Sequence, residues 1–542
     1  MKLKMVPCWN LRVYSHGGNM IQSKKAFKAV LGFTVAMGLS VSVNAAEFLI
    51  KYKNEKAVNK IVSMQTESSG IEVRSQHKAG KLLKVNLSSN QKSQARAIAA
   101  FYADKNVEYV VPNFKLYAFS APVDMKALKT QYALTKINAE AAWKRAGNKG
   151  SKNVLLAVID TGTDYNHKNL APNMVAGFDF RDNDADPMDL VSQSNPGHGT
   201  HCAGVVGATG LNDGGTTGMS PEVSIMPLRF LGADGSGDLE GAIKAIDYSI
   251  AKNVQVISAS WGAAVPLSTA KPLVEAIGRA EAAGIIFVAA AANDGKNNDT
   301  SEYYPTNAGT PNMISVAASD SNDAKPSWSN YGKSKVSLSA PGDAIMSTLP
   351  GDKYDNLSGT SMATPLVAGL VAFLKAQDPK LTGAEVRSLL QMTGAKVKIQ
   401  TACNCRIDAL SAVDTLLSQK AWIVPAAATV EVNATLQLEM KNAKGAVNFV
   451  SSDANIATVN AAGLLTGLKQ GTVTVKATDS SGNSVTSLDM NVGQVTATPP
   501  SNPPGNPGNP GTPGTPGQCP LGDPQLCAIL CQIMPTAPFC AP

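Results

Sequence analysis

Short, continuously apolar runs alternate with amphipathic stretches between residue 132 and about residue 420, and this alternation restricts the possible folds most. The apolar runs cover residues 154–159, 223–231, 254–258, 285–290 and 313–317. Strands that are apolar along their whole length are typical of a parallel sheet that is buried on both faces. Helical stretches such as 239–251 and 272–283 lie between several of these runs. The sequence therefore predicts an α/β fold with a mostly parallel sheet and flanking helices, with functional residues at the carboxyl ends of the strands.

The segment Gly359-Thr360-Ser361 precedes a stretch of small apolar residues, 366–374, which predicts a buried helix with Ser361 at its N-terminus. Free backbone N–H groups and the helix dipole favour negative charge at that place. An oxyanion that forms beside Ser361 would therefore meet donors already in position. Ser361 could also be a simple N-cap, which is the commonest role of a serine before a helix.

Asp160, His198 and Asn293 lie beside predicted strands or open a helix of small residues. Asp160 ends the first apolar run, Asn293 follows the fourth, and His198 opens a glycine-rich segment that also contains His201. Considered singly, Asp160 and Asn293 are typical turn residues, and the two histidines have the spacing of helical metal ligands. Considered with Ser361, they predict catalysis: Asp160 orients His198, which removes the serine proton, and Asn293 helps to bind the oxyanion.

Three motifs carry a resemblance to a known family. They are Ala157-Val158-Ile159-Asp160-Thr161-Gly162, His198-Gly199-Thr200-His201-Cys202-Ala203-Gly204 and Gly359-Thr360-Ser361-Met362-Ala363-Thr364-Pro365. With them the chain resembles the subtilisin-like serine peptidases, the subtilases, over residues 47 to about 415. The resemblance implies a serine endopeptidase that works through an acyl-enzyme, with Asp160, His198, Ser361 and Asn293 as catalytic residues. Ala292 departs from the family, which usually has glycine before the oxyanion asparagine.

The resemblance also implies where a peptide substrate binds. The segments Ser260-Trp261-Gly262 and Ala290-Ala291-Ala292 are similar to the two that pair with an extended peptide as added strands. Because backbone pairing accepts many sequences, we expect broad specificity.

Four aspartates crowd into one predicted loop before His198. They are Asp179, Asp182, Asp184 and Asp186. Such a cluster of hard oxygen ligands predicts a structural Ca²⁺ ion, and it resembles the aspartate-rich calcium loop of thermitase-like members of the family. The alternative is a solvated acidic loop.

Residues 46–119 predict a small α+β module in front of a peptidase region that spans 120–420. Strands are predicted at 47–52, 70–73, 82–87 and 107–111, and a helix at 91–103. The last strand and the residues after it resemble the end of subtilase propeptides, which are intramolecular chaperones and inhibitors. The resemblance implies a zymogen that cleaves itself between Phe119 and Ser120, with a preference for aromatic or large apolar residues before the cut.

Residues 1–45 predict a secretory signal peptide. Lys24, Lys25 and Lys28 precede the apolar run 29–43, small residues follow at Ala45 and Ala46, and Met20 could be the true start. The run is too short for a membrane span, and the alternative is a buried N-terminal helix. We therefore expect an exported protein, extracellular or on the cell surface.

Three segments follow the peptidase region. Residues 421–495 contain alternating stretches at 430–432, 446–451, 457–459, 471–477 and 485–492, which predict a small β-sandwich. Motifs such as Gly463-Leu464-Leu465-Thr466-Gly467 resemble the bacterial immunoglobulin-like group 2 fold, a module that contacts surfaces or polymers or serves as a spacer. Residues 496–517 form a linker rich in proline and glycine, and 518–542 form a tail with cysteines.

Seven of the eight cysteines remain when Cys8 leaves with the signal peptide. The four in the tail, which can pair in three ways, are Cys519, Cys527, Cys531 and Cys540. Export favours disulfides there over zinc, since no histidine lies nearby. Cys403 and Cys405 form a close pair, which leaves Cys202 as the predicted free thiol.

Composition excludes one class of partner. Charged residues make up 16% of the 542, the formal net charge is +7, and no dense cluster of Lys and Arg with aromatic residues occurs, so nucleic-acid binding is not expected. The favoured function is a secreted endopeptidase that acts on protein or peptide substrates and is inhibited by its own propeptide. The alternative is a surface-binding protein on an inactive peptidase scaffold. A hydrolase that does not cleave peptides would match the catalytic residues but not the pairing segments.

Overall fold

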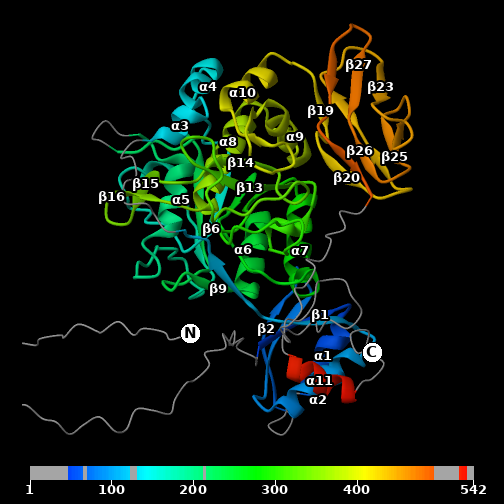
Figure 1. Ribbon diagram of the computed structural model, residues 1–542. Coiled ribbons are helices and arrows are strands. Elements are labelled where there is room, and N and C mark those ends of the chain that lie inside the picture. The colour runs from blue at the N-terminus through cyan, green and yellow to red at the C-terminus, as the bar shows by residue number, and fades with distance from the viewer. Residues whose placement is uncertain (1–46, 65–69, 122–130, 211–214, 494–523, 534–542) are drawn as a thin grey trace, which may run out of the picture. The chain divides into compact units, whose positions relative to one another are not determined.

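The computed structural model describes residues 47–64, 70–121, 131–210, 215–493 and 524–533 (Figure 1). The predicted signal peptide, the whole linker and most of the tail lie outside the described residues. Within them, no helix has the length and apolar character that crossing a bilayer requires.

A nine-stranded sheet is the centre of the peptidase region, and its order is β17-β18-β14-β13-β12-β10-β6-β8-β7. Its strands are β6 (Leu155–Asp160), β7 (Phe178–Asp179), β8 (Ser224–Arg229), β10 (Val256–Ala259), β12 (Ile286–Ala290), β13 (Met313–Ser319), β14 (Leu338–Pro341), β17 (Ala395–Lys396) and β18 (Cys405–Arg406). All neighbours are parallel except β17 and β18. The prediction of an α/β fold with a mostly parallel sheet is confirmed.

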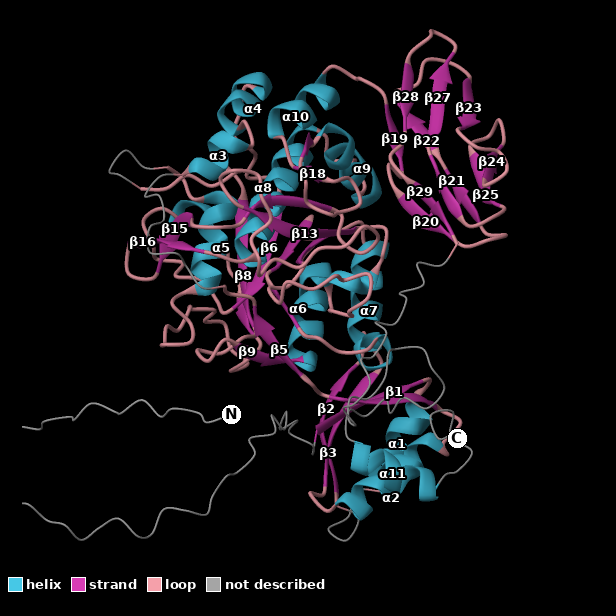
Figure 2. Cartoon of the chain, viewed as in Figure 1, coloured by secondary structure: helices cyan, strands magenta, loops and turns pink. Residues whose placement is uncertain are grey.

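Helices cover both faces of this sheet (Figure 2). Leu156 and Val158 of β6 lie in the apolar core that contains α5 (His198–Gly207) and α8 (Thr360–Gln377). Ala157 and Ile159 lie in the core that contains α6 (Leu239–Ala251) and α7 (Leu267–Ala282). Successive side chains of a strand point to opposite faces, so burial on both sides explains the unbroken apolar run.

Helix α8 is buried from Thr360 to Lys375. It contacts β10, β12, β13 and β14, and it lies beside α5. Small residues allow this approach, because a methyl group built on Gly369 would lie 2.9 Å from both Met219 Cβ and the Val206 carbonyl oxygen. The N-termini of α5 and α8 meet at the carboxyl ends of the strands, as the sequence predicts.

Shorter elements complete the peptidase region. They are α3 (Tyr132–Lys136), α4 (Ala139–Ala146), α9 (Gly383–Thr393), α10 (Ala409–Leu417), the short helices at Ala171–Asn173 and Thr306–Ala308, and the hairpin β15 (Ile345–Leu349) and β16 (Lys353–Leu357).

The N-terminal module has an antiparallel sheet in the order β2-β3-β1-β4. Its elements are β1 (Glu47–Tyr52), α1 (Glu55–Ser63), β2 (Ile71–His77), β3 (Leu82–Leu87), α2 (Gln91–Tyr102) and β4 (Val107–Pro112). The sequence prediction omits α1, whose short amphipathic pattern has Asn54 as its N-cap. Leu526 and Leu530 of α11 (Pro524–Ile533) are buried in the same apolar core.

A separate three-stranded sheet joins the end of this module to the peptidase region. Strand β5 (Lys115–Ala118) lies between β9 (Ser236–Asp238) and β11 (Trp261–Gly262), antiparallel to both.

The C-terminal β-domain has its own apolar core. Its strands are β19 (Trp422–Val424), β20 (Ala428–Val430), β21 (Thr435–Gln437), β22 (Glu439–Lys441), β23 (Val447–Ser451), β24 (Ala457–Val459), β25 (Leu464–Gly467), β26 (Gly471–Val473), β27 (Val475–Asp479), β28 (Ser484–Thr486) and β29 (Met490–Val492). The prediction of a single strand at 471–477 is wrong. The chain changes sheets at Thr474, since β26 pairs with β29 and β27 pairs with β23, and both Val473 and Val475 remain buried.

The cysteines follow the pattern expected of an exported protein. Cys403 and Cys405 form a disulfide, and Cys527 and Cys531 are both disulfide-bonded. Cys202 is free and buried, so the prediction of the unpaired thiol is confirmed.

Two glycines in helix interiors test the packing of α8. Alanine is favoured over glycine in a helix by about 1 kcal/mol, so Gly278→Ala in α7, where an added methyl group meets nothing within 4 Å, is expected to stabilise the protein. Gly369→Ala is expected to destabilise it by about 1–3 kcal/mol, because the methyl group would overpack against Met219 and Val206. Denaturant unfolding of both variants in a Ser361→Ala background measures the difference. Equal effects of the two substitutions would contradict this account of α8.

Candidate active site

Asp160 and His198 face each other at the edge of the sheet. Asp160 is the last residue of β6 and His198 the first of α5, and the His198 Nδ1 to Asp160 Oδ1 distance is 2.7 Å. Both side chains are buried. Burial opposes a charged imidazole, but the Asp160 carboxylate outweighs it and raises the pKa of His198 well above its ordinary value. His198 Nε2 is buried and has no hydrogen-bond partner among the described residues, so no described group competes for the proton that this nitrogen would exchange with a substrate or a hydroxyl.

His201 has a different environment from His198. Its Nε2 lies 2.8 Å from the Ile345 carbonyl oxygen, and burial, assisted by the charge of His198, lowers the pKa of His201 to about 3. The backbone carbonyl oxygens hold one nitrogen of this neutral ring. Among the described residues, His201 is not part of a group whose ligand atoms gather closely enough to hold a metal ion.

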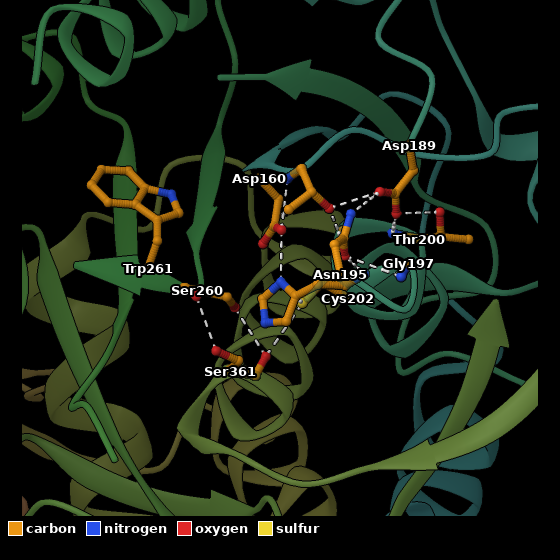
Figure 3. A network of polar contacts seen from close by, with 12 residues as sticks. Asp160, Asp189, Asn195, Gly197, Thr200, Cys202, Ser260, Trp261 and Ser361 are labelled. Carbon is orange, nitrogen blue, oxygen red and sulfur yellow. Dashed lines mark hydrogen bonds and ion pairs between the residues drawn. The ribbon is translucent and has the colours of Figure 1, made fainter. Parts of the chain in front are cut away.

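Ser361 lies in the first turn of α8 and is fully buried. Its hydroxyl donates to the Ser260 carbonyl oxygen at 2.9 Å. Two side chains hold its own carbonyl oxygen: Ser260 Oγ at 2.9 Å and Cys202 Sγ at 3.4 Å. Cys202 Sγ also lies 3.9 Å from His198 Nδ1, so this buried thiol packs between the first turns of α5 and α8. Figure 3 shows Ser260 and Ser361 side by side.

Asn293 presents an unpaired amide to the same place. Its Oδ1 accepts from both the backbone N–H and the hydroxyl of Thr360 at 2.9 Å, which fixes the amide orientation. Its Nδ2 is buried and has no hydrogen-bond partner in the part of the chain that the structure describes. A methyl group built on Gly359 would lie 2.7 Å from the Phe119 carbonyl oxygen, 3.2 Å from Asn293 Nδ2 and 3.4 Å from Ser361 N. One carbonyl oxygen and two N–H donors therefore converge on a single glycine.

The chain from Lys115 to Ala121 passes through this site as an extended strand. Phe119 N donates to the Ser260 carbonyl at 3.1 Å, and Ala121 N donates to the Ser358 carbonyl at 2.8 Å. The ring of Phe119 lies against Gly262, where an added methyl group would be 2.8 Å from the ring. The predicted cleavage point, between Phe119 and Ser120, therefore lies between two anchored residues and beside Ser361.

For the strand from Lys115 to Ala118, the predicted pairing with residues 290–292 is wrong. Trp261 and Gly262 do pair with β5, but the other edge of β5 pairs with β9 rather than with residues 290–292. Ala290 is paired inside the main sheet. The Ala291 and Ala292 carbonyl oxygens already accept hydrogen bonds from Asn298 and Asn330. Ala291 N also donates to the Val316 carbonyl oxygen, so the described hydrogen bonds of these residues go to the main sheet and to neighbouring loops rather than to the strand at 115–121.

The four aspartates of the predicted calcium loop have different partners. Asp179 is buried and forms an ion pair with Arg229, whose Nη1 also lies 2.7 Å from Asp182 Oδ2. Asp184 and Asp186 are exposed, and each accepts a local backbone N–H. No three ligand atoms of this loop gather within 4.8 Å in the described part of the chain.

The guanidinium of Arg229 supplies positive charge beside Asp179 and Asp182. Calcium at the four aspartates stays a prediction from the resemblance, which thermal unfolding with and without Ca²⁺ would test.

Sequence reasoning did not find several residues that build the site. Strand β9 has the sequence Ser-Gly-Asp and no apolar pattern, so nothing indicated a strand. Asp189 and Asn195 lie in the loop before His198 and bind the start of α5. An asparagine three residues before a helix start is a recognisable capping signal, but the role of Asp189 depends on tertiary contacts.

Ala292 is the one departure from the family beside the oxyanion asparagine, and its backbone has a φ of +89°. A residue with a Cβ is strained there, whereas glycine is not. Ala292→Gly is therefore expected to stabilise the protein by about 1 kcal/mol, measured by denaturant unfolding in the Ser361→Ala background. Ala291→Gly, beside it but without a positive φ, is the control and is expected to destabilise. A destabilising Ala292→Gly would contradict the strain.

Comparisons with known proteins agree with this arrangement. The family model described as "Subtilase family" matches residues 151–404, and the model of the bacterial Ig-like domain (group 2) matches residues 416–490. The chain is 40% identical to Thermitase of Thermoactinomyces vulgaris over 276 residues, 51% of this chain and 92% of that protein. It is 35% identical to Subtilisin E of Bacillus subtilis over 299 residues, 55% of this chain and 73% of that protein. The chain belongs to the subtilase family, and it carries a bacterial Ig-like domain after the peptidase region.

Proposed function

We propose that this serine endopeptidase is made as a precursor that cuts its own chain between Phe119 and Ser120. The observation that carries the proposal is the strand from Lys115 to Ala121, which pairs with β9 and β11 and passes Ser361 as an extended peptide. Peptidases bind substrates in this way, because backbone pairing presents the scissile bond in a defined register.

In the proposed reaction, Ser361 attacks the Phe119 carbonyl carbon while His198 Nε2 takes the serine proton. The serine hydroxyl must first leave the Ser260 carbonyl, a rotation about one side-chain bond. Asp160 holds the imidazolium that forms. Asn293 Nδ2 and Ser361 N–H stabilise the oxyanion, and His198 then returns the proton to the leaving amine of Ser120. Water then attacks the acyl-enzyme: His198 takes the proton of the water and gives it to Ser361 as the ester bond breaks.

Contacts away from the cut support an inhibitory role for residues 46–119. Lys51 Nζ lies 2.8 Å and the Tyr109 hydroxyl 3.0 Å from Glu275 Oε2 on α7. Asn113 Nδ2 lies 3.1 Å from Asp238 Oδ2, at the start of α6. After cleavage these contacts would keep the product strand in the site. The pro-segment would then inhibit the enzyme until it is itself degraded.

Self-processing gives the decisive test, and it also tests the proposed export after residue 45. The intact mass of the secreted wild type is expected to match a chain that begins at Ser120, whereas the mass of Ser361→Ala is expected to include the pro-segment. Asn293→Ala is expected to process about 100- to 1000-fold more slowly, the loss known for the oxyanion asparagine of subtilisin. Ser249→Ala, a buried serine of α6 that hydrogen-bonds the Ala245 carbonyl, is the control and should process normally. A wild type that keeps residues 46–119 would favour a binding protein on an inactive scaffold.

The position of Phe119 supports a preference for aromatic or large apolar residues before the cut. Its ring packs against Gly262, a position where a side chain would collide with it. Phe119→Glu is expected to slow self-processing by more than tenfold, since a half-buried carboxylate without a partner is unfavourable. Phe119→Leu serves as the apolar control. Cleavage of a denatured protein mainly after Lys, Arg or Glu, mapped by mass spectrometry, would contradict the preference.

The Ig-like domain is proposed to contact a surface or polymer outside the cell. A pull-down with insoluble polymers that compares the full chain with one ending at residue 420 tests this proposal. Equal retention of both would make the domain a spacer.

A further inference from the structure

The first turn of α5 carries His198 but cannot cap itself. Its N-cap is Gly197, which has no side chain, and no other residue can replace it easily. Gly197 has a φ of +109°, and a methyl group built on it would lie 2.2 Å from Pro350 Cδ. The free N–H groups of this turn therefore need acceptors from elsewhere in the chain.

Two neighbouring side chains supply the first acceptors. Asn195 Oδ1 accepts from Gly197 N at 3.1 Å and from His198 N at 2.8 Å. Thr161 Oγ1 accepts from Gly199 N at 2.9 Å. Both acceptors can rotate about their side-chain bonds, so something must hold them in place.

Asp189 binds both of these side chains and the next residue of the helix. Its Oδ1 accepts from Thr161 Oγ1 and Asn195 Nδ2, each at 2.9 Å. Its Oδ2 accepts from the backbone N–H of Thr200 at 2.9 Å and from the Thr200 hydroxyl at 2.7 Å. Figure 3 shows Asp189 between Thr200 and Asn195. The carboxylate is 4% exposed, and all of these donors are neutral.

The same carboxylate connects the two halves of the catalytic pair. Thr161 follows Asp160 directly, and its backbone N–H donates to Asp160 Oδ1 at 2.7 Å, the oxygen that His198 Nδ1 also contacts. Thr200 is two residues after His198 on α5. Asp189 therefore joins the end of β6 to the start of α5 beside the bond between Asp160 and His198.

We propose that Asp189 is a positioning residue for catalysis: it caps α5 through Thr161, Asn195 and Thr200, and so sets His198 against Asp160. The inference rests on the proposed function, because it assumes that His198 is the base for Ser361. Asp189 touches neither substrate nor the reacting atoms. Its effect is on the rate of the chemical step rather than on peptide binding, since β9 and β11 make no contact with it in the described hydrogen bonds.

Asp189→Asn is a sharp test because the side chain keeps its shape. Asp189 Oδ1 accepts from Asn195 Nδ2, and Oδ2 accepts from Thr200 N. Neither of these donors can become an acceptor. Whichever way the new amide turns, one N–H group faces another. Misplacement of His198 by a fraction of an ångström to 1 Å is expected to lower kcat by about 10- to 100-fold. The KM for a peptide substrate is expected to stay within about twofold to threefold.

Asp408→Asn is the matched control. Asp408 is 8% exposed, caps α10 through Ser411 N at 2.8 Å and accepts from Asn138 Nδ2 at 2.6 Å, away from the site. It is expected to lower the Tm while kcat per active site, titrated with a fluorophosphonate, stays within twofold. The rate of self-processing of the full chain is measured beside kcat, because the strand is already bound there and KM plays no part.

The outcomes separate the two proposals. If Asp189→Asn lowers the Tm as Asp408→Asn does but leaves kcat and self-processing within twofold, Asp189 is only structural and the inference is overturned. If Ser361→Ala still hydrolyses peptides at the wild-type rate, the proposed function itself is wrong. Should Asp189→Asn not fold, Thr200→Val removes one hydrogen bond to the same carboxylate. An unchanged kcat in that variant overturns the inference as well.

Discussion

The burial of α8 against the centre of the parallel sheet is the constraint on which the rest of the site depends. The helix contacts four strands and α5. This packing places the first turn of the helix at the carboxyl edge of the sheet. A buried helix N-terminus presents unpaired N–H groups in a region from which water is excluded. The protein places Ser361 there, where those groups can meet the charge that develops on a substrate carbonyl. Small residues such as Gly369 permit the close approach.

The contact between Asp160 and His198 depends on a second junction, between β6 and α5. Neither element can fix His198 alone, because the helix begins with glycine and the strand ends at Asp160. Hydrogen bonds from the loop between them hold both ends. Asp189 and Asn195 of this loop are buried, which makes each unsatisfied group unfavourable and each satisfied one specific. Rigid positioning therefore comes from a network rather than from one capping residue.

The proposed pro-segment binds by strand pairing, as a substrate would, and it also contacts the peptidase region through a second surface. Strand β5 pairs through its backbone, while the sheet of the N-terminal module contacts α6 and α7 through ion pairs and hydrogen bonds. Strand pairing alone is tolerant of sequence, and many peptides could compete for it. Contacts at Glu275 and Asp238 are specific to this module. The combination would hold the product of the proposed self-cleavage in place.

Much of this protein was determined by its sequence alone. Continuous apolar runs predicted the parallel sheet, because strands buried on both faces need no polar side chain. Asp160, His198, Asn293 and Ser361 were identifiable from short motifs, since a nucleophile, a base and an acid need fixed residue types beside glycine and small residues. The free Cys202 followed from counting the cysteines.

Tertiary structure decided what depends on contacts between distant segments. Strand β9 has no apolar pattern, and only its place beside β5 makes it a binding strand. Asp179 pairs with Arg229 because the chain brings a guanidinium to it from β8. The role of Asp189 depends on the fold, which brings Thr161 and Thr200, 39 residues apart in the sequence, to one carboxylate. Hydrogen bonds of this kind leave no period in the sequence, since they follow from where folded elements meet.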